Sequence, residues 1–267
     1  MAASLHVAPW FAPARRTILA LALIGTVAAG AFAWSAFPSV LVEGPNAIRK
    51  VTPQGVITTI AGNGQAGFSG DGDSALNASL SQPEGIAVDR RGNVFIAEFN
   101  NHRIRKVSPA GIIVTVAGNG TAGFSGDGGL ASKASLNITP AVTVDSSGNL
   151  YICDRENHRV RKVDRRGIIT TVAGNGIEAT TENIGDGGVA TAASLNRPVG
   201  LALDRAGNLY IAERNGHRVR KVTPVGVITT MASTALSASR SAVVAKPFAP
   251  VSATVALTAS GATSVTP

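Results

Sequence analysis

Three histidines are the side chains best suited to metal binding or proton transfer. They are His102, His158 and His217, and each comes directly before an arginine. Imidazole is a common zinc ligand and general base, but a metal site needs several ligands that converge on one point. The three stand at the same place in successive copies of a repeated sequence, which spreads them through the fold. We therefore expect a histidine hydrogen-bonded within each turn, and no metal or catalytic site.

Carboxylates flanked by glycine offer a second kind of chemistry. Four of them are weak calcium candidates, because calcium is bound by carboxylates on flexible backbone: Asp71, Asp73, Asp127 and Asp186. Their loops lack the several oxygen side chains of an EF-hand, and Asp73 has no counterpart in the later copies. Turn formation is the favoured interpretation of these loops.

A carboxylate also precedes an arginine across a short connection in each copy. The pairs are Glu98 with Arg103, Asp154 with Arg159, and Glu213 with Arg218. A guanidinium binds a carboxylate through charge-assisted hydrogen bonds, so we expect partly buried ion pairs that fix each connection.

The formal net charge is +8, which would suit a nucleic-acid partner. The repeated string alone, however, supplies 11 of the 24 basic residues: Arg49, Lys50, Arg103, Arg105, Lys106, Arg159, Arg161, Lys162, Arg218, Arg220 and Lys221. Because these arginines and lysines belong to strands, the charge does not by itself indicate a partner, and no nucleic-acid partner is expected.

Cys153 is the only cysteine, so no intramolecular disulfide can form. It stands where other copies have Ala97 and Ala212, which favours a small buried residue over a reactive thiol. No nucleophile motif, phosphate-binding loop or Cys/His metal spacing is present. We therefore expect no cofactor and no enzyme activity.

These residues recur because one stretch of sequence is repeated four times along the chain. The string that starts at Ile48 returns at Ile104, Val160 and Val219, after 56, 56 and 59 residues. The longer last interval comes from a segment between Gly-Asn-Gly and Gly-Asp-Gly, which identifies that segment as loop. A period of this size predicts a repeat architecture whose units bury their apolar faces against one another.

Each period contains four short runs of strand-forming residues. In the second copy they cover 85–89, 93–98, 103–107 and 112–117, and Asp89 with Gly92 predicts a tight turn between the first two. The runs are continuously apolar, which is typical of strands covered on both faces. A four-stranded meander repeated in tandem predicts the blades of a β-propeller.

The string from Asn101 to Val107, with its copies, resembles the signature of the NHL-repeat family over about residues 46–232. The resemblance implies a propeller, commonly six-bladed, that is used mainly as a binding platform. This chain departs from the family in number. We expect an all-β fold, a β-propeller or open propeller arc of four-stranded antiparallel blades, with complete blades near 85–118, 141–174 and 200–232 and a half blade at 48–61.

A closed propeller needs four or more blades, which leaves three alternatives. The arc stays open, self-association with another chain completes the ring, or the C-terminal tail completes the first blade. The tail alternates apolar and polar residues as a strand does, with the apolar positions at Val251, Ala253, Val255 and Leu257.

The two ends differ from the repeats. Residues 1–37 predict a signal peptide or transmembrane anchor, because Arg15 and Arg16 precede an uncharged apolar stretch. The paired arginines should keep the residues before them on the cytoplasmic side of the membrane. The repeats, residues 44–232, are therefore expected outside the cytoplasm, in the periplasm, on the cell surface or in the medium as a secreted protein. Membrane contact is expected only through the N-terminal segment. Residues 233–267, rich in Ala, Ser, Thr and Val, predict a linker or the start of a further β-domain.

The function that these patterns favour is a non-catalytic extracytoplasmic binding or scaffold module. Its long loops between blades would be presented to a protein or glycan ligand, while Phe68 and Phe124 in those loops fill the gap between blades. One alternative is a metal-dependent hydrolase or lyase with a site on the propeller axis. Single-stranded RNA binding, known among NHL-type propellers, is disfavoured by export.

Overall fold

The computed structural model describes residues 19–20, 40–180 and 184–233, and these form an all-β fold. They build four antiparallel sheets of four strands each, numbered here in chain order. The first sheet holds β1 Leu19–Ala20, β2 Val40–Gly44, β3 Ala47–Val51 and β4 Ile57–Ala61. The second holds β5 Pro83–Val88, β6 Val94–Glu98, β7 Arg103–Val107 and β8 Ile113–Ala117. The third holds β9 Val142–Val144, β10 Leu150–Asp154, β11 Arg159–Val163 and β12 Ile169–Ala173, and the fourth β13 Pro198–Leu203, β14 Leu209–Glu213, β15 Arg218–Val222 and β16 Ile228–Ser233.

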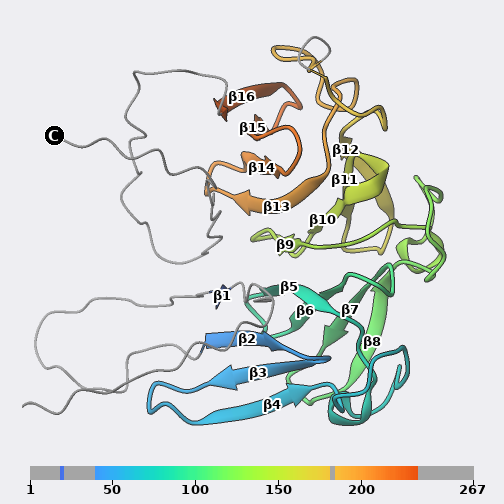
Figure 1. Cartoon of the computed structure of the whole chain (residues 1–267), viewed down its shortest axis with the longest axis vertical. Helices are drawn as coiled ribbons and strands as arrows, with labels where there is room; N and C mark the ends of the chain where they lie inside the picture. Colours follow the sequence, from blue (N-terminus) through green and yellow to red (C-terminus); the bar gives the residue numbers. More distant parts are fainter. Residues whose placement is uncertain (1–18, 21–39, 181–183, 234–267) are drawn as a thin grey trace, which may run out of the picture.

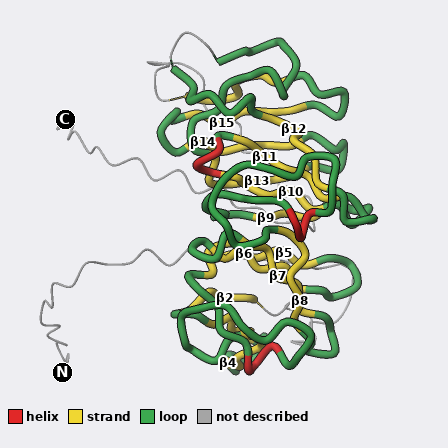
Figure 2. The backbone as a smooth tube through the Cα atoms, turned by 90° about the vertical axis from the view of Figure 1, so that its right-hand side faces the viewer, coloured by secondary structure: helices red, strands yellow, loops and turns green. Residues whose placement is uncertain are grey.

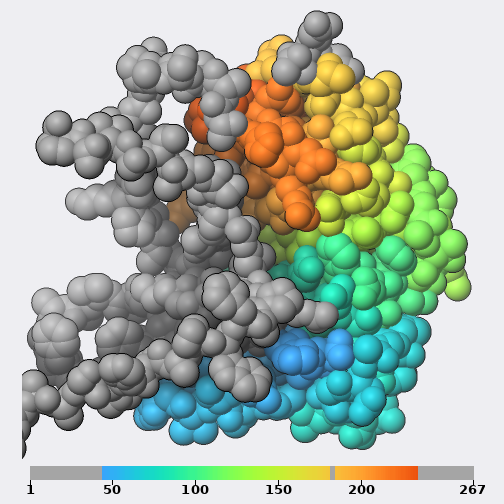
Figure 3. All heavy atoms as spheres, in the orientation of Figure 1, coloured from blue at the N-terminus to red at the C-terminus, as the bar shows by residue number. Residues whose placement is uncertain are grey.

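The sheets stack face to face in chain order, as propeller blades do (Figure 1). Strand β2 contacts β5, β5 contacts β9, and β9 contacts β13. The space-filling view shows the same order on the surface, from blue to orange-red (Figure 3). The described sheets form an open arc and do not close into a ring.

Long connections join the outermost strand of one sheet to the innermost strand of the next. These inter-sheet loops cover residues 62–82, 118–141 and 174–197. Each of the first two contains a single turn of 3-10 helix, Ala75–Asn77 and Ala131–Lys133. A third such turn, Arg155–Asn157, joins β10 to β11. In Figure 2 the loops, drawn in green, run in front of the strands on the outer side of the stack.

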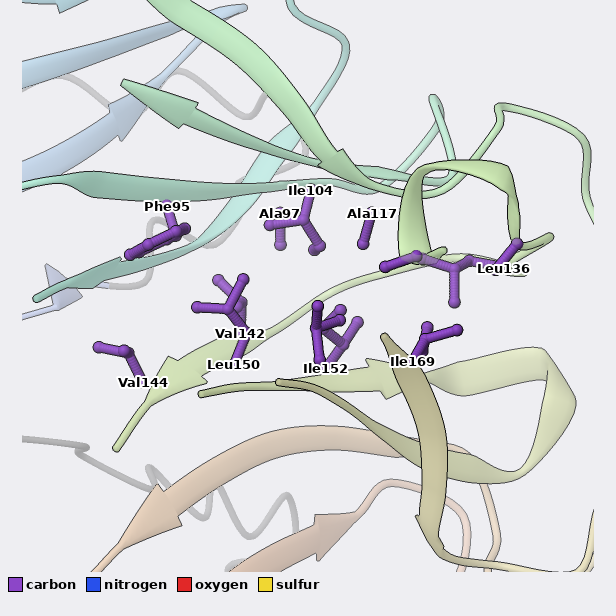
Figure 4. Packing of buried hydrophobic residues seen from close by; sticks show 13 residues of the cluster. Phe95, Ala97, Ile104, Ala117, Leu136, Val142, Val144, Leu150, Ile152 and Ile169 are labelled. Carbon is purple, nitrogen blue, oxygen red and sulfur yellow. The ribbon is translucent and has the colours of Figure 1, made fainter. Parts of the chain in front are cut away.

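The core lies between neighbouring sheets, and strand β6 shows how it is shared. Phe95 and Ala97 face the third sheet, while Val94 and Ile96 pack toward the first. Figure 4 shows Phe95 and Ala97 directed at Val142 of the third sheet. The expectation of strands buried on both faces is therefore confirmed.

The expected strands are confirmed within two residues at their ends, and so is the turn between β5 and β6. The Asp89 carboxylate accepts hydrogen bonds from the backbone N–H groups of Arg91 and Asn93, and Gly92 has φ of 80°. The first sheet holds more than the expected half blade, because β2 pairs with β3 and the two-residue β1 pairs with β2.

Two expectations about the ends remain predictions. The tail strand at 251–257 lies outside the described residues, as does most of the expected signal or anchor segment. In the part of the chain that the structure describes, no helix is long and apolar enough to cross a membrane.

Candidate functional site: buried arginines and the inter-sheet loops

One arginine in each of the last three sheets is completely buried. Arg105, Arg161 and Arg220 lie on the third strand of their sheets, and each has 0% of its surface exposed. Just before each of them, the ladder to the fourth strand shifts register at a β-bulge, for example between Ile104 and Arg105. A bulge bends the strand and re-aims the side chain beside it. The arginine is thereby directed at groups outside the regular ladder.

Each buried guanidinium joins two carboxylates that come from different parts of the chain. Arg105 Nη1 lies 3.2 Å from Oε1 of Glu98 on the neighbouring strand, and Nη2 lies 2.7 Å from Oδ1 of Asp71 in the preceding inter-sheet loop. Arg105 also donates to the carbonyl oxygen of Ser69 at 3.0 Å. The arginine therefore fastens the loop to the sheet that follows it.

The same arrangement recurs in the next two sheets. Arg161 pairs with Asp154 at 3.1 Å and Asp127 at 2.6 Å, and Arg220 pairs with Glu213 at 3.1 Å and Asp186 at 2.7 Å. Asp127 accepts two further hydrogen bonds, from the backbone N–H and the hydroxyl of Thr171. We call these three groups the arginine anchors.

The backbone of each inter-sheet loop also forms hydrogen bonds with the outer strand of the sheet that follows it. In the second sheet the N–H of Gly72 donates to the carbonyl of Ile113 at 2.7 Å, and the N–H of Ile113 donates back to Asp73 at 3.0 Å. Ser74 forms an isolated antiparallel bridge with Ile112. Equivalent bridges cover the outer strands of the third and fourth sheets. The loop therefore acts as an additional edge segment, which protects the outer strand from unwanted pairing.

Burial and pairing act in opposite directions on the anchor carboxylates. Burial raises the pKa of the Glu98 carboxyl above its ordinary value, while a hydrogen bond from Asn101 and the charge of Arg105 lower it. At Asp186 burial again raises the pKa, but hydrogen bonds from Thr230 and Arg220 outweigh it, so the pKa lies below the ordinary value. Buried charges of both signs are tolerated here because each guanidinium is paired with carboxylates, although Nε of Arg220 has no hydrogen-bond partner.

The structure corrects the expected partner of the strand carboxylates. Glu98, Asp154 and Glu213 pair with Arg105, Arg161 and Arg220, and not with the expected Arg103, Arg159 and Arg218. Glu98 lies directly opposite Arg103 in the ladder. Directly opposite Cβ atoms are only about 5 Å apart, so a long arginine overreaches, whereas a diagonal neighbour about 7–8 Å away reaches the carboxylate with its guanidinium.

Arg103 and Arg159 make contacts to the inter-sheet loops on both sides of their sheets. Arg103 donates to the carbonyl oxygens of Asn101 at 3.3 Å and Asn119 at 2.6 Å, and its guanidinium lies 3.8 Å from the ring centroid of Phe68. Arg159 stacks on Phe124 at the same distance. Each of these guanidinium groups therefore contacts two inter-sheet loops: it binds the backbone of the loop that follows its sheet and stacks on the aromatic ring of the loop that precedes it.

The calcium candidates are already paired with other groups. Asp71, Asp127 and Asp186 each face a guanidinium, as described above, and the Asp73 carboxylate accepts a hydrogen bond from the N–H of Ser74. Across the described ranges no group of three or more His, Cys, Asp or Glu side chains converges as a metal site.

Two of the three histidines, His102 and His158, link neighbouring sheets. The backbone N–H of Ile138, in the loop that leads into the third sheet, donates to Nδ1 of His102 at 2.9 Å. The backbone N–H of Arg197, before the fourth sheet, donates to Nδ1 of His158 at 3.4 Å. Asn46 takes the histidine's place in the first sheet and accepts from Gln82. The expected bond within the turn is therefore corrected to a bond with the next connection. Burial, followed by the nearby charge of Arg103, lowers the pKa of His102, which favours the neutral acceptor.

Comparison with known proteins agrees with this repeated geometry. The family model of the Teneurin NHL domain matches residues 63–125, 120–180 and 175–258. The chain belongs to this NHL-repeat family. Human Teneurin-1 is 31% identical over 189 residues, and chicken (Gallus gallus) Teneurin-1 is 30% identical over 189 residues, each match covering 66% of this chain. The chain spans only 6% and 7% of those two proteins.

A solved structure shares the fold of these NHL repeats. It is a structural genomics protein of unknown function from Bacteroides thetaiotaomicron, 24% identical, with a TM-score of 0.55 over 68% of this chain and 44% of that one. Three positions of the repeated NHL string thus have a physical role: His102 and His158 link neighbouring sheets, Arg103 and Arg159 bind loop backbone, and the second arginine of each of the last three copies forms the anchor.

The NHL loops expose apolar side chains on their outer surface. Phe68 and Phe124 are 42% and 43% exposed, so they do not fill the gap between blades as expected but lie on the surface over guanidinium groups. With four further exposed side chains they form what we call the loop rim: Phe68, Leu76, Phe124, Leu130, Ile177 and Val189. The sequence predicted core positions for the two phenylalanines, because their stacking on arginines distant in sequence leaves no local pattern.

Proposed function

We propose that the protein is a non-catalytic binding or scaffold module outside the cytoplasm, and that its loop rim receives a protein or glycan ligand. The observation that carries this proposal is the combination of anchored loops with exposed apolar side chains. Exposed apolar patches on a monomer surface often mark interaction sites. Here they stand on loops whose backbone is fixed by Arg105, Arg161 and Arg220.

Rigid loops favour binding because less conformational freedom is lost when a ligand arrives. Phe124 is held by Arg159 and Arg161, with guanidinium carbons 3.8 and 4.7 Å from the ring centroid. An exposed aromatic ring held in this way can stack on a sugar ring or enter an apolar pocket of a protein. Both ligand classes are therefore part of the proposal.

A scaffold role also agrees with how the charged residues are used. The most buried arginines are neutralised by carboxylates, so they do not contribute to a basic surface for nucleic acid. The enzyme alternative, a metal-dependent hydrolase or lyase, would need ligands that converge near the axis, and the residues described here supply no such group.

The test is to screen the full chain against an immobilised oligosaccharide array and a panel of extracellular protein domains. Replacement of Phe124 by Ala together with Leu130 by Ser is expected to reduce binding by about tenfold or more, because two exposed anchors are removed. The matched control is Val225→Ser, since Val225 is 86% exposed but lies on the turn between β15 and β16. Equal loss in the control would contradict a ligand site on the loop rim.

Two further measurements test the absence of catalysis and the location outside the cytoplasm. Elemental analysis of the purified chain should find no stoichiometric divalent metal, and finding one together with hydrolase or lyase activity would favour the enzyme alternative. Fractionation of the producing cell should place the protein outside the cytoplasm. Export rests on the sequence of residues 1–37 alone.

A further inference from the structure

Phe99, Arg155 and Arg214 occupy one repeated position of the fold, directly after the second strand of their sheets. The backbone N–H of each donates to a carbonyl oxygen in the loop that leads into the same sheet, at 3.0 Å in all three. The backbone is therefore repeated but the side chain is not, since the second sheet has phenylalanine where the third and fourth have arginine. An arginine that the repeat does not need at this position is a candidate for a role other than folding.

Arg155 is the residue on which these neighbouring sheets converge. Only 9% of its surface is exposed, and its guanidinium carbon lies 5.6 Å from the ring centroid of Phe99 in the second sheet. Its Nε lies 3.3 Å from Oε1 of Glu156. Oε2 of the same carboxylate lies 3.3 Å from Nη2 of Arg197, which directly precedes the fourth sheet. Residues from three sheets thus surround one buried guanidinium.

Two further charged residues act on this guanidinium. Burial raises the pKa of the Glu84 carboxyl above its ordinary value, while the charges of Arg155 and Arg214 lower it. Burial also lowers the pKa of Arg155; the charge of Glu156 opposes this effect, whereas the charges of Arg214 and Arg197 add to it. Like charges are therefore held close together. We call the six residues the Arg155 cluster: Glu84, Phe99, Arg155, Glu156, Arg197 and Arg214.

The guanidinium groups of the Arg155 cluster are incompletely satisfied. Nε of Arg155 and Nε of Arg197 are buried without a hydrogen-bond partner, although both arginines pair with Glu156. A buried donor without a partner reduces stability. In the arginine anchors, by contrast, each guanidinium is paired with two carboxylates. The Arg155 cluster therefore has the donors and the positive charge to receive an anion.

Solvent reaches the cluster at two of its arginines. Arg214 is exposed, and the Arg197 side chain is 38% exposed. A guanidinium at the surface can bind an arriving anion through two parallel N–H donors. Within the six described side chains, three guanidinium groups face two carboxylates, so one negative charge balances the cluster.

We propose that the Arg155 cluster binds the carboxylate of a small organic acid. Arg197 and Arg214 offer donors at the surface, and Arg155 adds a buried positive charge. A carboxylate is favoured over a phosphate because the nearby carboxylates Glu84 and Glu156 repel a second negative charge. Phe99, which is half-buried, offers an apolar contact to the organic part of the acid. The site uses no residue of the loop rim, so the two proposals can fail separately.

The test uses benzoate as the probe, because it joins one carboxylate to an apolar ring. Benzoate is titrated at constant ionic strength into the isotope-labelled full chain, and NMR follows the backbone amides and the arginine Nε–H signals. Saturable shifts are expected at residues 155–157 and at Arg197 and Arg214. Benzamide, which has a similar shape without the charge, should bind about tenfold or more weakly than benzoate, and inorganic phosphate should also bind more weakly.

Two variants test the assignment to these residues. Arg214→Ala removes an exposed guanidinium, so the fold should be retained while benzoate binding weakens about tenfold. Arg155→Phe gives the third sheet the side chain that the second sheet has at this position. It should weaken binding about tenfold or more without lowering the free energy of unfolding, because a buried charge is replaced by an apolar ring. A purely structural role of Arg155 would instead lower stability.

The matched control is Arg91→Ala, which removes the same charge from an exposed turn between β5 and β6. Benzoate binding by this variant should be unchanged. An equal loss in Arg91→Ala and Arg214→Ala would reduce the effect to general charge attraction and overturn the proposal. Equal binding of benzamide, tighter binding of phosphate, unchanged binding by Arg155→Phe, or no saturable shift up to the solubility limit of benzoate would each overturn it as well.

Discussion

Nη2 of Arg161 lies 2.6 Å from Oδ1 of Asp127, although the two residues are 34 positions apart. The same separation of 34 joins Arg105 to Asp71 and Arg220 to Asp186. The loop insertion in the third copy lies before Asp186 and leaves this spacing unchanged. Each inter-sheet loop is thus a structural part of the sheet that follows it, and not a flexible linker.

Removal of the loop carboxylate should release the loop. Asp127→Asn weakens the pair with Arg161 and the hydrogen bonds from Thr171, while Arg161 keeps Asp154. Because hydrogen bonds to charged groups contribute about 1.5–3 kcal/mol, we expect the free energy of unfolding to fall by about that amount. Chemical denaturation measures the loss, and hydrogen exchange should show faster exchange in residues 118–136.

The control for this variant removes an exposed ion pair. Arg166→Ala breaks the pair with Asp164, but the Arg166 side chain is 82% exposed. Exposed pairs contribute about 0–1 kcal/mol, so the change should be small. If Asp127→Asn destabilised no more than Arg166→Ala, the loop carboxylates could not be regarded as anchors.

The two arginines of one strand should differ sharply in their effect on stability. Arg105→Met leaves the buried Glu98 without its guanidinium partner, so we expect a loss of about 3–5 kcal/mol. Arg103→Met removes bonds to two carbonyl oxygens and a stacked ring at the surface, and should cost about 1–2 kcal/mol. A double-mutant cycle of Glu98 with each arginine measures the coupling. Stronger coupling to Arg103 than to Arg105 would restore the pairing expected from sequence.

The strands and turns were predictable because their signals are local, whereas the arginine anchors were not. Asp89 and Gly92 specify a turn through their own backbone preferences. The choice of Arg105 over Arg103 depends on a bulge and on a diagonal contact, and neither leaves a local pattern in the sequence. The available signal was the constant spacing from Asp71, Asp127 and Asp186 to the second arginine of each string. The stacking of Arg103 on Phe68 is likewise a contact between residues distant in sequence.

The histidine link predicts a pH dependence of stability. The pKa of folded His102 lies below the ordinary value of about 6.5, so the unfolded chain binds more protons in this range. The stability contributed by neutral His102 is therefore present above the unfolded pKa and is lost as the pH falls through the folded pKa. Protonated Nδ1 also cannot accept from the N–H of Ile138.

His102→Asn is the matched variant, because Asn46 does the same task in the first sheet. Asparagine does not titrate, so the wild type should lose more stability than the variant between pH 8 and pH 5. The free energy of unfolding at both pH values measures this difference. If the wild type and the variant lost the same free energy of unfolding, a group other than His102 would be responsible for the pH dependence.

The single thiol should be unreactive in the folded protein. Cys153 is 0% exposed, and burial, followed by the nearby charge of Asp154, raises the pKa of its thiol well above the ordinary value. Because the thiolate is the reactive form, a thiol reagent should modify one cysteine only after unfolding. Ser146→Cys, on an exposed turn of the same sheet, supplies a second thiol that should react at once. Rapid modification of native wild-type protein would mean that the third sheet opens readily.

Two glycines with similar backbone angles should differ in their tolerance of a methyl group. Gly118 has φ of 88° and Gly111 has φ of 79°, so alanine at either position carries the strain of a left-handed conformation, about 1–2 kcal/mol. A Cβ at Gly118 would also lie 2.1 Å from the carbonyl oxygen of His102, whereas at Gly111 nothing lies within 4 Å. Gly118→Ala must therefore push the loop away from the turn that links the second and third sheets. We expect its free energy of unfolding to fall further than that of Gly111→Ala, with faster hydrogen exchange at Ile138, and equal losses would show that loop and turn do not meet this closely.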